Sequence, residues 1–138
     1  MKTLFIIVGS SLLLFGLVTL VALESGDVLV IETIDASADP TATEPRRTHI
    51  WYVEEDGQLV LEAGNPENPW VRDIAKEPNV RISGDSVTGT YSLVVDQSEL
   101  AQNRIRKLMR QKYGWRDVWV STLFDVSGSQ LVNANAIH

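Results

Sequence analysis

NPWVRDIAKEPNVRI, residues 68–82, places a short helix between two strand-like segments and a tryptophan at the start of that helix. Pro69 suits the first helical position because this position needs no backbone N–H donor. Glu77 and Pro78 end the helix, since the residue before a proline disfavours the helical conformation. The stretch therefore predicts a helix of about two turns inserted into a sheet, with Trp70 directly behind its first residue.

The segment before this helix predicts a β-hairpin. RTHIWYVEEDGQLVLEAG, residues 47–64, holds two β-rich runs joined through Glu55, Asp56 and Gly57. Asp-Gly between such runs favours a tight turn, because both residue types tolerate positive φ.

Four more segments have the composition of strands, rich in β-branched residues and bounded by turn residues. They are DVLVIETI (27–34), RISG (81–84), SVTGTYSLVVD (86–96) and SQLVNANAI (129–137). Gly84-Asp85 predicts a second hairpin of the same type as the first, and the Asp, Ser, Pro and Thr residues of 35–45 predict a loop. About six strands are too many for an open sheet of this size unless it curls. We therefore expect an α+β domain built on a small antiparallel split β-barrel with short helices.

Residues 96–114, DQSELAQNRIRKLMRQKYG, predict an amphipathic helix that Asp96 or Ser98 can cap and Gly114 can end. Its apolar side consists of Ala101, Ile105, Leu108 and Met109. Its other side is basic, with Arg104, Arg106, Lys107, Arg110, Lys112 and, just beyond, Arg116. Two interpretations of the basic side stay open: a solvated helix face, or a face turned towards anionic lipid headgroups or an anionic cofactor.

The first segment, LFIIVGSSLLLFGLVTLVAL (residues 4–23), carries no charge. At about 1.5 Å per residue it crosses the roughly 30 Å hydrocarbon layer of a bilayer. A cleaved signal peptide is the alternative, but its apolar region is usually about 7–15 residues long and ends at an Ala-x-Ala-like site. Val21-Ala22-Leu23 does not match such a site. We therefore expect residues 1–24 to form a single-pass membrane anchor and residues 25–138 to form the domain.

The charges that flank the apolar segment favour a domain on the extracytoplasmic side. Lys2 and the amino terminus are positive, and positive flanks stay in the cytoplasm. The other flank is acidic: residues 24–44 include no Lys or Arg and six acidic residues, Glu24, Asp27, Glu32, Asp35, Asp39 and Glu44.

Composition argues against several function classes. The net charge of −6 gives no sign of a nucleic-acid binder. The chain has no cysteine, so a redox function requires a bound cofactor. His49 is the only internal histidine, which gives no basis for a metal site and predicts a hydrogen-bonding residue of a strand. Trp115 and Trp119 lie four residues apart, on the same side of a short final helix, and fit either the core or a membrane-interface belt.

The pattern Pro-Trp-x-x-x-Ile-x-x-x-Pro-x-Val at 69–80, after a hairpin with Pro-Arg, Tyr-Val and Asp-Gly, resembles the deazaflavin-dependent nitroreductase family. That family belongs to the split-barrel flavin-binding superfamily, which also contains the pyridoxamine 5′-phosphate oxidases. The matching residues are Pro45, Arg46, Trp51, Tyr52, Val53, Asp56, Gly57, Pro69, Trp70, Ile74, Pro78 and Val80. With the later helix and the final strand, the resemblance covers roughly residues 28–137.

The resemblance implies a groove that binds deazaflavin or FMN, and a homodimer is possible because related barrels often dimerise. By position, the ring wall is Trp70 with the backbone of Ala63 and Gly64, and the phosphate side is Arg46 and Arg47. An aromatic side chain offers a flat partner for a ring, and Arg offers a bidentate fork for phosphate. No catalytic residue follows from the resemblance. Where the family has a basic Gly-Arg-Lys-Ser/Thr-Gly loop, residues 35–44 carry three acidic side chains and no basic one, which would repel a phosphate.

Two functions stay open on the sequence. The first is a membrane-anchored oxidoreductase of the deazaflavin- or flavin-dependent nitroreductase type, acting on a small or lipid-soluble acceptor such as a quinone, with the chemistry supplied by the cofactor. The second is a non-catalytic, membrane-tethered split-barrel binding or scaffold module without the phosphate-binding loop. Trp70 distinguishes them, because it either plugs one end of the barrel or forms the wall of a ring-binding groove.

Overall fold

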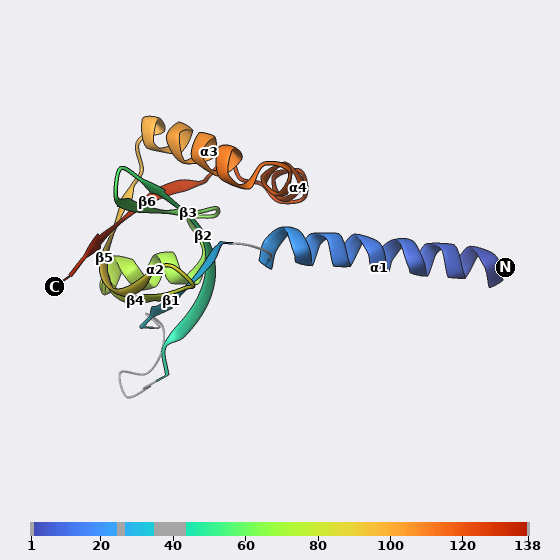
Figure 1. The fold of residues 1–138 in the computed structure, drawn as a ribbon, viewed down its shortest axis with the longest axis horizontal. Coiled ribbons are helices and arrows are strands. Elements are labelled where there is room, and N and C mark those ends of the chain that lie inside the picture. The colour runs from blue at the N-terminus through green and yellow to red at the C-terminus, as the bar shows by residue number, and fades with distance from the viewer. Residues whose placement is uncertain (1, 25–26, 35–43, 138) are drawn as a thin grey trace.

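The computed structural model of this chain describes residues 2–24, 27–34 and 44–137. Figure 1 shows a barrel with one long helix that projects from it and two further helices along one side. The elements in chain order are α1 (Lys2–Glu24), β1 (Val28–Thr33), β2 (Arg46–Glu55), β3 (Gln58–Ala63), α2 (Pro69–Lys76), β4 (Asn79–Ser83), β5 (Thr88–Asp96), α3 (Glu99–Tyr113), α4 (Trp115–Leu123) and β6 (Gln130–Ala136).

The six strands close into one antiparallel barrel in the order β1-β2-β3-β6-β5-β4. The pairing of β1 with β4, through Val30, Ile31 and Glu32, completes the circle. Each strand then has two neighbours, so the sheet has no edge with unpaired backbone groups. The predicted α+β fold with a six-stranded antiparallel barrel is confirmed. Most of the predicted 35–45 loop lies outside the described residues.

The β2-β3 hairpin turns where the sequence predicts. Asp56 has φ 52° and Gly57 has φ 77°, and Glu55 pairs with Gln58 on either side of them. Two residues with positive φ define a type I′ turn, whose twist matches that of the flanking strands.

The β4-β5 hairpin differs from the prediction of a second turn of the same type. Ser83 pairs with Thr88, so the connection has four residues, and none of them has positive φ. Gly84 is needed for another reason: a Cβ built there would lie 2.3 Å from Cδ2 of Leu29. This glycine permits close packing of the β4-β5 connection against β1.

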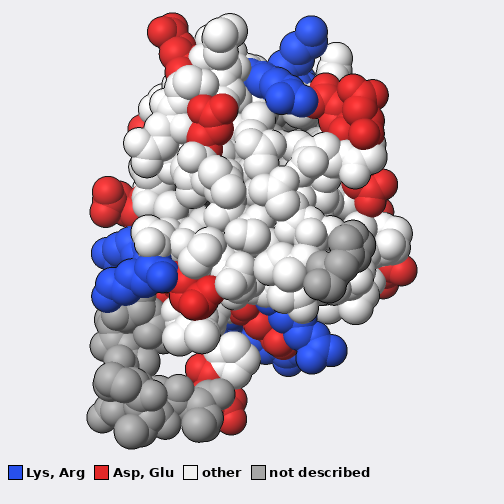
Figure 2. Space-filling view, turned by 90° about the vertical axis from the view of Figure 1, so that its left-hand side faces the viewer, with Lys and Arg blue, Asp and Glu red and all other residues white. Residues whose placement is uncertain are grey.

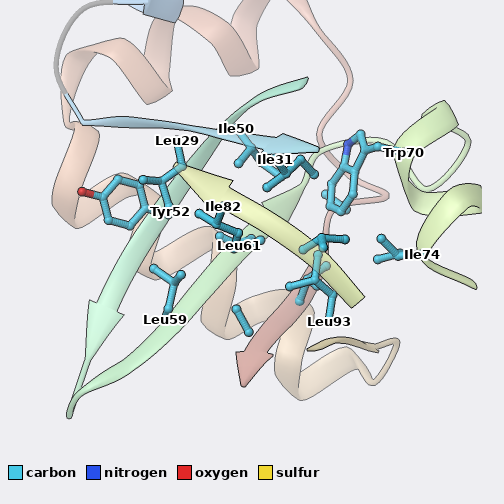
Figure 3. Close-up of a cluster of buried hydrophobic side chains, with 14 of the residues drawn as sticks. Leu29, Ile31, Ile50, Tyr52, Leu59, Leu61, Trp70, Ile74, Ile82 and Leu93 are labelled. Carbon is cyan, nitrogen blue, oxygen red and sulfur yellow. The ribbon is translucent and has the colours of Figure 1, made fainter. Parts of the chain in front are cut away.

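The barrel interior holds the main core. Figure 3 shows apolar side chains of several strands pointing towards one another, with Trp70 and Ile74 of α2 added at one end and Tyr52 at the other. The largest fully buried residues of this cluster include Leu29, Ile31, Leu61 and Ile82. Pro69 is the first residue of α2 and Glu77 caps its other end, as predicted. The short helix therefore lies over one end of the barrel.

A second core cluster lies outside the barrel, beneath α3. Ala101, Ile105 and Met109 are buried there as predicted, against Val60 and Leu131. Tyr113 joins them in place of the half-buried Leu108. Its hydroxyl donates to the carbonyl oxygen of Asp27 at 2.7 Å and accepts from the backbone N–H of Tyr52 at 3.0 Å. Of the two candidate caps, Ser98 is the N-cap, and Gly114 ends α3 with φ 54°.

α1 is the one described helix long and apolar enough to cross a membrane, over Phe5–Glu24. Its last turns contact α4: the rings of Phe15 and Trp119 lie 5.4 Å apart, and Trp119 Nε1 donates to Thr19 Oγ1 at 3.1 Å. The side of the molecule that faces away from α1, shown in Figure 2, is largely uncharged at its centre, with Lys, Arg, Asp and Glu around the rim.

Candidate functional site

A cleft of about 530 Å³ lies between the end of α1, the first half of β2, the β3-α2 loop and α4. One part of its lining is apolar or aromatic, with Leu23, Val28, Ile50, Trp51, Trp70, Val120, Phe124 and Val126. The polar part consists of Glu24, Thr48, His49, Glu62, Gly64, Asn65, Asn68 and Asp125. The cleft thus combines flat apolar walls, suited to an aromatic ring, with hydrogen-bonding groups at several points.

Two of the five residues predicted to hold a cofactor line this cleft. Gly64 lies in its wall, and a Cβ built on Gly64 meets no atom within 4 Å, so the wall is open at that point. Trp70 also lines the cleft, but the residue is only 3% exposed and belongs to the barrel core. Most of the Trp70 side chain therefore closes the barrel, and only a small part of its surface faces the cleft. Ala63 is fully buried in the core instead.

The two predicted phosphate ligands, Arg46 and Arg47, lie outside the cleft lining. Arg46 Nε donates to Asp73 Oδ2 at 2.9 Å, and Asp73, which is buried, also accepts from Thr33 Oγ1 at 2.7 Å. This cluster ties α2 to the start of β2 and the end of β1. Arg47 is exposed and forms an ion pair of 2.9 Å with Glu32, its cross-strand neighbour. Both guanidinium groups thus already have a carboxylate partner.

His49 and Trp51 connect the barrel to the end of α1 at the edge of the cleft. His49 Nδ1 lies 2.6 Å from Glu24 Oε2, and Trp51 Nε1 donates to the carbonyl oxygen of Leu23 at 3.2 Å. The hydrogen-bonding role predicted for His49 is confirmed. The ring of Trp51 stacks on Tyr113 with centroids 4.2 Å apart, which orients the indole.

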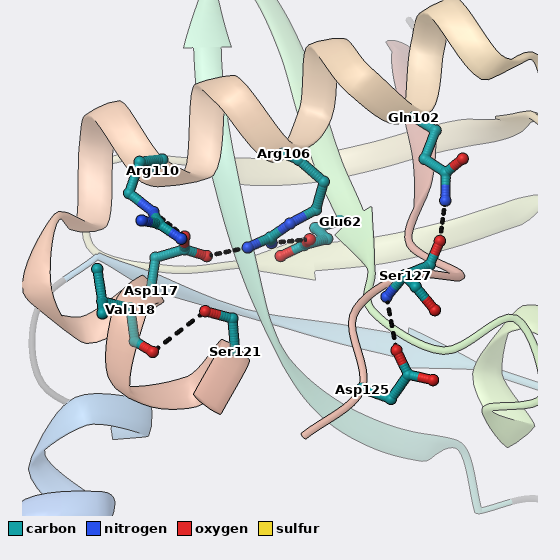
Figure 4. A network of polar contacts seen from close by, with 9 residues as sticks. All are labelled: Glu62, Gln102, Arg106, Arg110, Asp117, Val118, Ser121, Asp125 and Ser127. Atoms are coloured by element: carbon teal, nitrogen blue, oxygen red, sulfur yellow. Dashed lines mark hydrogen bonds and ion pairs between the residues drawn. The ribbon is translucent and has the colours of Figure 1, made fainter. Parts of the chain in front are cut away.

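A polar network of buried and half-buried groups adjoins the cleft at Glu62 (Figure 4). Glu62 Oε1 lies 2.5 Å from Arg106 Nη1, and Arg106 Nη2 donates to Asp117 Oδ1 at 2.6 Å. Arg110 Nε donates to the other oxygen of Asp117, also at 2.6 Å. The network joins β3, α3 and α4, and it holds α4 in place beside the cleft.

The network also changes the interpretation of the basic side of α3. Arg106 and Arg110 pair with Asp117, Arg104 pairs with Glu55, and Lys112 donates to the carbonyl oxygen of Tyr52 at 2.8 Å. The side chains of Arg104 and Arg110 are about half exposed, in line with the predicted solvated face. Those of Arg106 and Lys112 are largely buried, and acidic and carbonyl groups of the protein accept their hydrogen bonds. Sequence periodicity identified the helix faces but not those partners.

Burial governs the titration of the groups in this region. It raises the pKa of the Glu62 carboxyl above its ordinary value, although the Arg106 guanidinium acts in the opposite direction. Burial also lowers the pKa of the Lys112 ammonium, against the opposing effect of Asp27. Glu62 is therefore a carboxyl group beside the cleft that binds a proton more readily than an exposed glutamate does.

The residues present fit one part of a flavin or deazaflavin. Aromatic walls formed by Trp51 and Phe124, with the aliphatic Leu23 and Val120, suit its flat ring. Its anionic phosphate side finds no Lys or Arg among the lining residues, where the acidic groups are Glu24, Glu62 and Asp125. The cleft as it stands is thus better matched to a neutral ring than to a phosphate.

The closed six-stranded barrel, with α2 inserted between two strands and a cleft beside it, defines a split barrel. The model of the F420H(2)-dependent quinone reductase family matches residues 17–127, and the chain belongs to that family. The match begins inside α1, so it includes the last turns of that helix, which border the cleft. Family and fold together support a reductase that uses a flavin or deazaflavin.

Solved structures with this fold are distant in sequence. The conserved hypothetical protein Rv2991 from Mycobacterium tuberculosis matches with a TM-score of 0.57 and 16% identity, over 83% of this chain and 75% of that one. The general stress protein 26 from Bacillus anthracis gives 0.53 and 14%, over 86% of each chain. A putative pyridoxamine 5′-phosphate oxidase from Listeria innocua gives 0.51 and 16%, over 91% and 94%. At these identities the likeness concerns the fold.

Proposed function

We propose that this protein is a membrane-anchored reductase that transfers reducing equivalents from deazaflavin or FMN to a lipid-soluble quinone bound in the cleft. The observation that carries the proposal is the position of the cleft. Leu23 and Glu24, at the end of the apolar helix α1, form part of its wall together with Gly64 and Trp70. A cleft at the end of a membrane anchor is accessible to an acceptor that resides in the bilayer.

When bound, the reduced cofactor supplies the hydride that converts a quinone, together with a proton, to a hydroquinone. The residues of this chain bind and orient the flat rings and exclude water. Trp51, fixed by its stack on Tyr113, and Phe124 provide apolar walls, while Thr48 and Asn68 provide hydrogen-bonding groups. Arg47 is the candidate for the phosphate side, because its guanidinium is exposed and its ion pair with Glu32 is on the surface.

Activity is tested with the full-length protein in phospholipid nanodiscs, supplied with reduced deazaflavin or reduced FMN and a short-tailed quinone. Oxidation of the cofactor, followed by visible absorbance, is expected to depend on both the protein and the quinone. Gly64→Leu is the blocking variant, because the space around Gly64 accepts a side chain without a clash. Val94→Leu, an exposed β5 position outside the cleft lining, is the control for added bulk. Equal activity of the two variants would place the reaction outside this cleft.

Cofactor binding is tested separately from turnover. Arg47→Ala removes a surface ion pair and should change the stability of the fold by less than about 1 kcal/mol. If Arg47 binds phosphate, the variant should lose about 1.5–3 kcal/mol of cofactor affinity, the value of a charged hydrogen bond, measured by equilibrium dialysis. Unchanged affinity would exclude Arg47 as a phosphate ligand.

A second candidate function is a non-catalytic binding module tethered to the membrane. The acidic lining of the cleft favours it, since none of the lining residues is a Lys or Arg that could hold a phosphate. The colour of the purified protein distinguishes the two functions. A preparation that is colourless after incubation with FMN or deazaflavin and removal of the unbound cofactor supports the binding module.

The orientation proposed for the anchor places the barrel on the extracytoplasmic side. Protease added to intact cells without their outer barrier should then digest the domain, whereas protection would reverse the orientation. The substitutions Glu24→Lys and Asp27→Lys should weaken the preference for an extracytoplasmic domain, because positive flanks are retained in the cytoplasm. The possible homodimer is tested by crosslinking of the detergent-solubilised chain at increasing dilution.

A further inference from the structure

The exposed side of α4 and of the residue after it carries no charge. The exposed residues between 115 and 124 are Trp115, Val118, Thr122, Leu123 and Phe124. The two charged residues in this range turn elsewhere: Asp117 is buried against Arg106 and Arg110, and Arg116 lies over the ring of Tyr113. A surface helix normally exposes its charged residues to water. α4 does the opposite, because the ion pairs of Asp117 fix the apolar side outwards.

Contacts between α4 and α1 fix the level of α4 along the apolar helix. Trp119 contacts Phe15 and Thr19, which lie nine and five residues, respectively, before Glu24, the last residue of α1. At about 1.5 Å per residue, Thr19 lies roughly 7 Å and Phe15 roughly 13 Å along the helix from that end. Trp119 therefore lies beside apolar residues of α1 rather than beyond its end.

Figure 1 shows how the two helices cross. α1 runs horizontally across the picture, whereas α4 is seen nearly end-on beside the last turns of α1. A helix that crosses a membrane-spanning helix in this way runs along the membrane surface. Amphipathic interfacial helices lie at a depth of about 5–10 Å, which agrees with the level of Thr19. Tryptophan is enriched at that boundary because it combines an apolar ring with an N–H donor.

We propose that α4 is a second membrane contact, embedded in the boundary between headgroups and acyl chains of the bilayer that α1 crosses. The proposal rests on the membrane anchor described above and not on the reductase activity. Its partner is the lipid bilayer itself, which the uncharged side chains of α4 meet. Because Val120 and Phe124 also line the cleft, one wall of the cleft lies at the level of the lipid headgroups.

The absence of cysteine from the chain permits a direct test with single-cysteine variants. Val118→Cys and Thr122→Cys place a nitroxide label on the exposed side of α4. Leu100→Cys is the aqueous control, because Leu100 is exposed at the start of α3. Figure 1 shows that α3 starts at its end away from α1. Leu12→Cys, exposed in the middle of α1, is the control for insertion of the anchor. The full-length variants are reconstituted into vesicles of phosphatidylethanolamine and phosphatidylglycerol.

Relaxation of each label by oxygen and by a water-soluble nickel chelate reports whether it lies in lipid or in water. Labels at Leu12, Val118 and Thr122 are expected to favour oxygen, and the label at Leu100 to favour nickel. The proposal would be overturned if the nickel chelate relaxed the α4 labels as strongly as the Leu100 label while oxygen relaxed the Leu12 label more strongly. The anchor would then still be inserted. If Leu12 also favours nickel, the anchor does not insert and the proposal fails with it. Neither result depends on turnover, so reductase activity is judged separately.

Discussion

Replacement of Trp70 by alanine tests whether this tryptophan closes the barrel. The residue is 3% exposed and packs with the barrel core beside Ile31 and Ile74 (Figure 3). An aromatic side chain buries about 150–250 Å², which corresponds to about 4–6 kcal/mol at about 25 cal/mol per Å². Aromatic-to-alanine changes in protein cores cost about 3–5 kcal/mol. We therefore expect Trp70→Ala to lower the free energy of unfolding by about 3–5 kcal/mol.

Urea unfolding of the full-length chain in mild detergent, followed by intrinsic fluorescence, measures this loss. With an m-value of about 2 kcal/mol per M, the urea midpoint should fall by about 2 M. Trp115→Ala is the matched control, because the same side chain is 56% exposed there, and it should stay within about 0.5 kcal/mol of the wild type. Similar losses in the two variants would refute the role of Trp70 as a plug.

Three further predictions concern the network, its titration and the tight turn. Asp117→Ala leaves Arg106 and Arg110 without their shared carboxylate and should cost about 3–5 kcal/mol, whereas Arg104→Ala, at an exposed pair, should cost less than about 1 kcal/mol, both by urea unfolding. Burial raises the pKa of Glu62, so the folded state binds a proton at this residue more readily than the unfolded chain does. The stability that this proton contributes is fully present below the ordinary pKa of 4.5 and is lost as the pH rises through the raised pKa. Paired unfolding curves across this pH range should show that fall in the wild type and not in Glu62→Gln. Gly57→Ala, at φ 77°, should cost about 1–2 kcal/mol, and Gly64→Ala, at ordinary φ with open space, should be nearly neutral in the same thermal unfolding experiment.

The parts of the fold that the sequence predicts are those governed by local rules. Asp56-Gly57 determines a tight turn through its own backbone angles, and Pro69 and Pro78 bound α2 without help from distant residues. Gly84 is a counterexample, since its requirement comes from Leu29, more than fifty positions earlier, and not from a turn. The closure of the barrel followed from strand number, because unpaired edges are unfavourable.

The site was less accessible to prediction because long-range contacts build it. Gly64 and Trp70 line the cleft, but its other walls include Leu23 and Phe124, which are 101 positions apart in the chain. Arg46 and Arg47 have the residue type that phosphate requires, yet Asp73 and Glu32 already bind them. Pairing of this kind depends on tertiary structure, which residue type and spacing do not determine.

The ladder that closes the barrel is a mechanical weak point of the fold. β1 is the first strand after α1, and its ladder with β4 spans only Val30, Ile31 and Glu32, whereas its ladder with β2 spans all of Val28–Thr33. In the proposed anchored protein, a force that acts along the chain from α1 reaches β1 as the first strand of the barrel. Under tension, the short β1-β4 ladder breaks before the long β1-β2 ladder. The barrel then opens between β1 and β4, while β3, β6, β5 and β4 remain paired with one another.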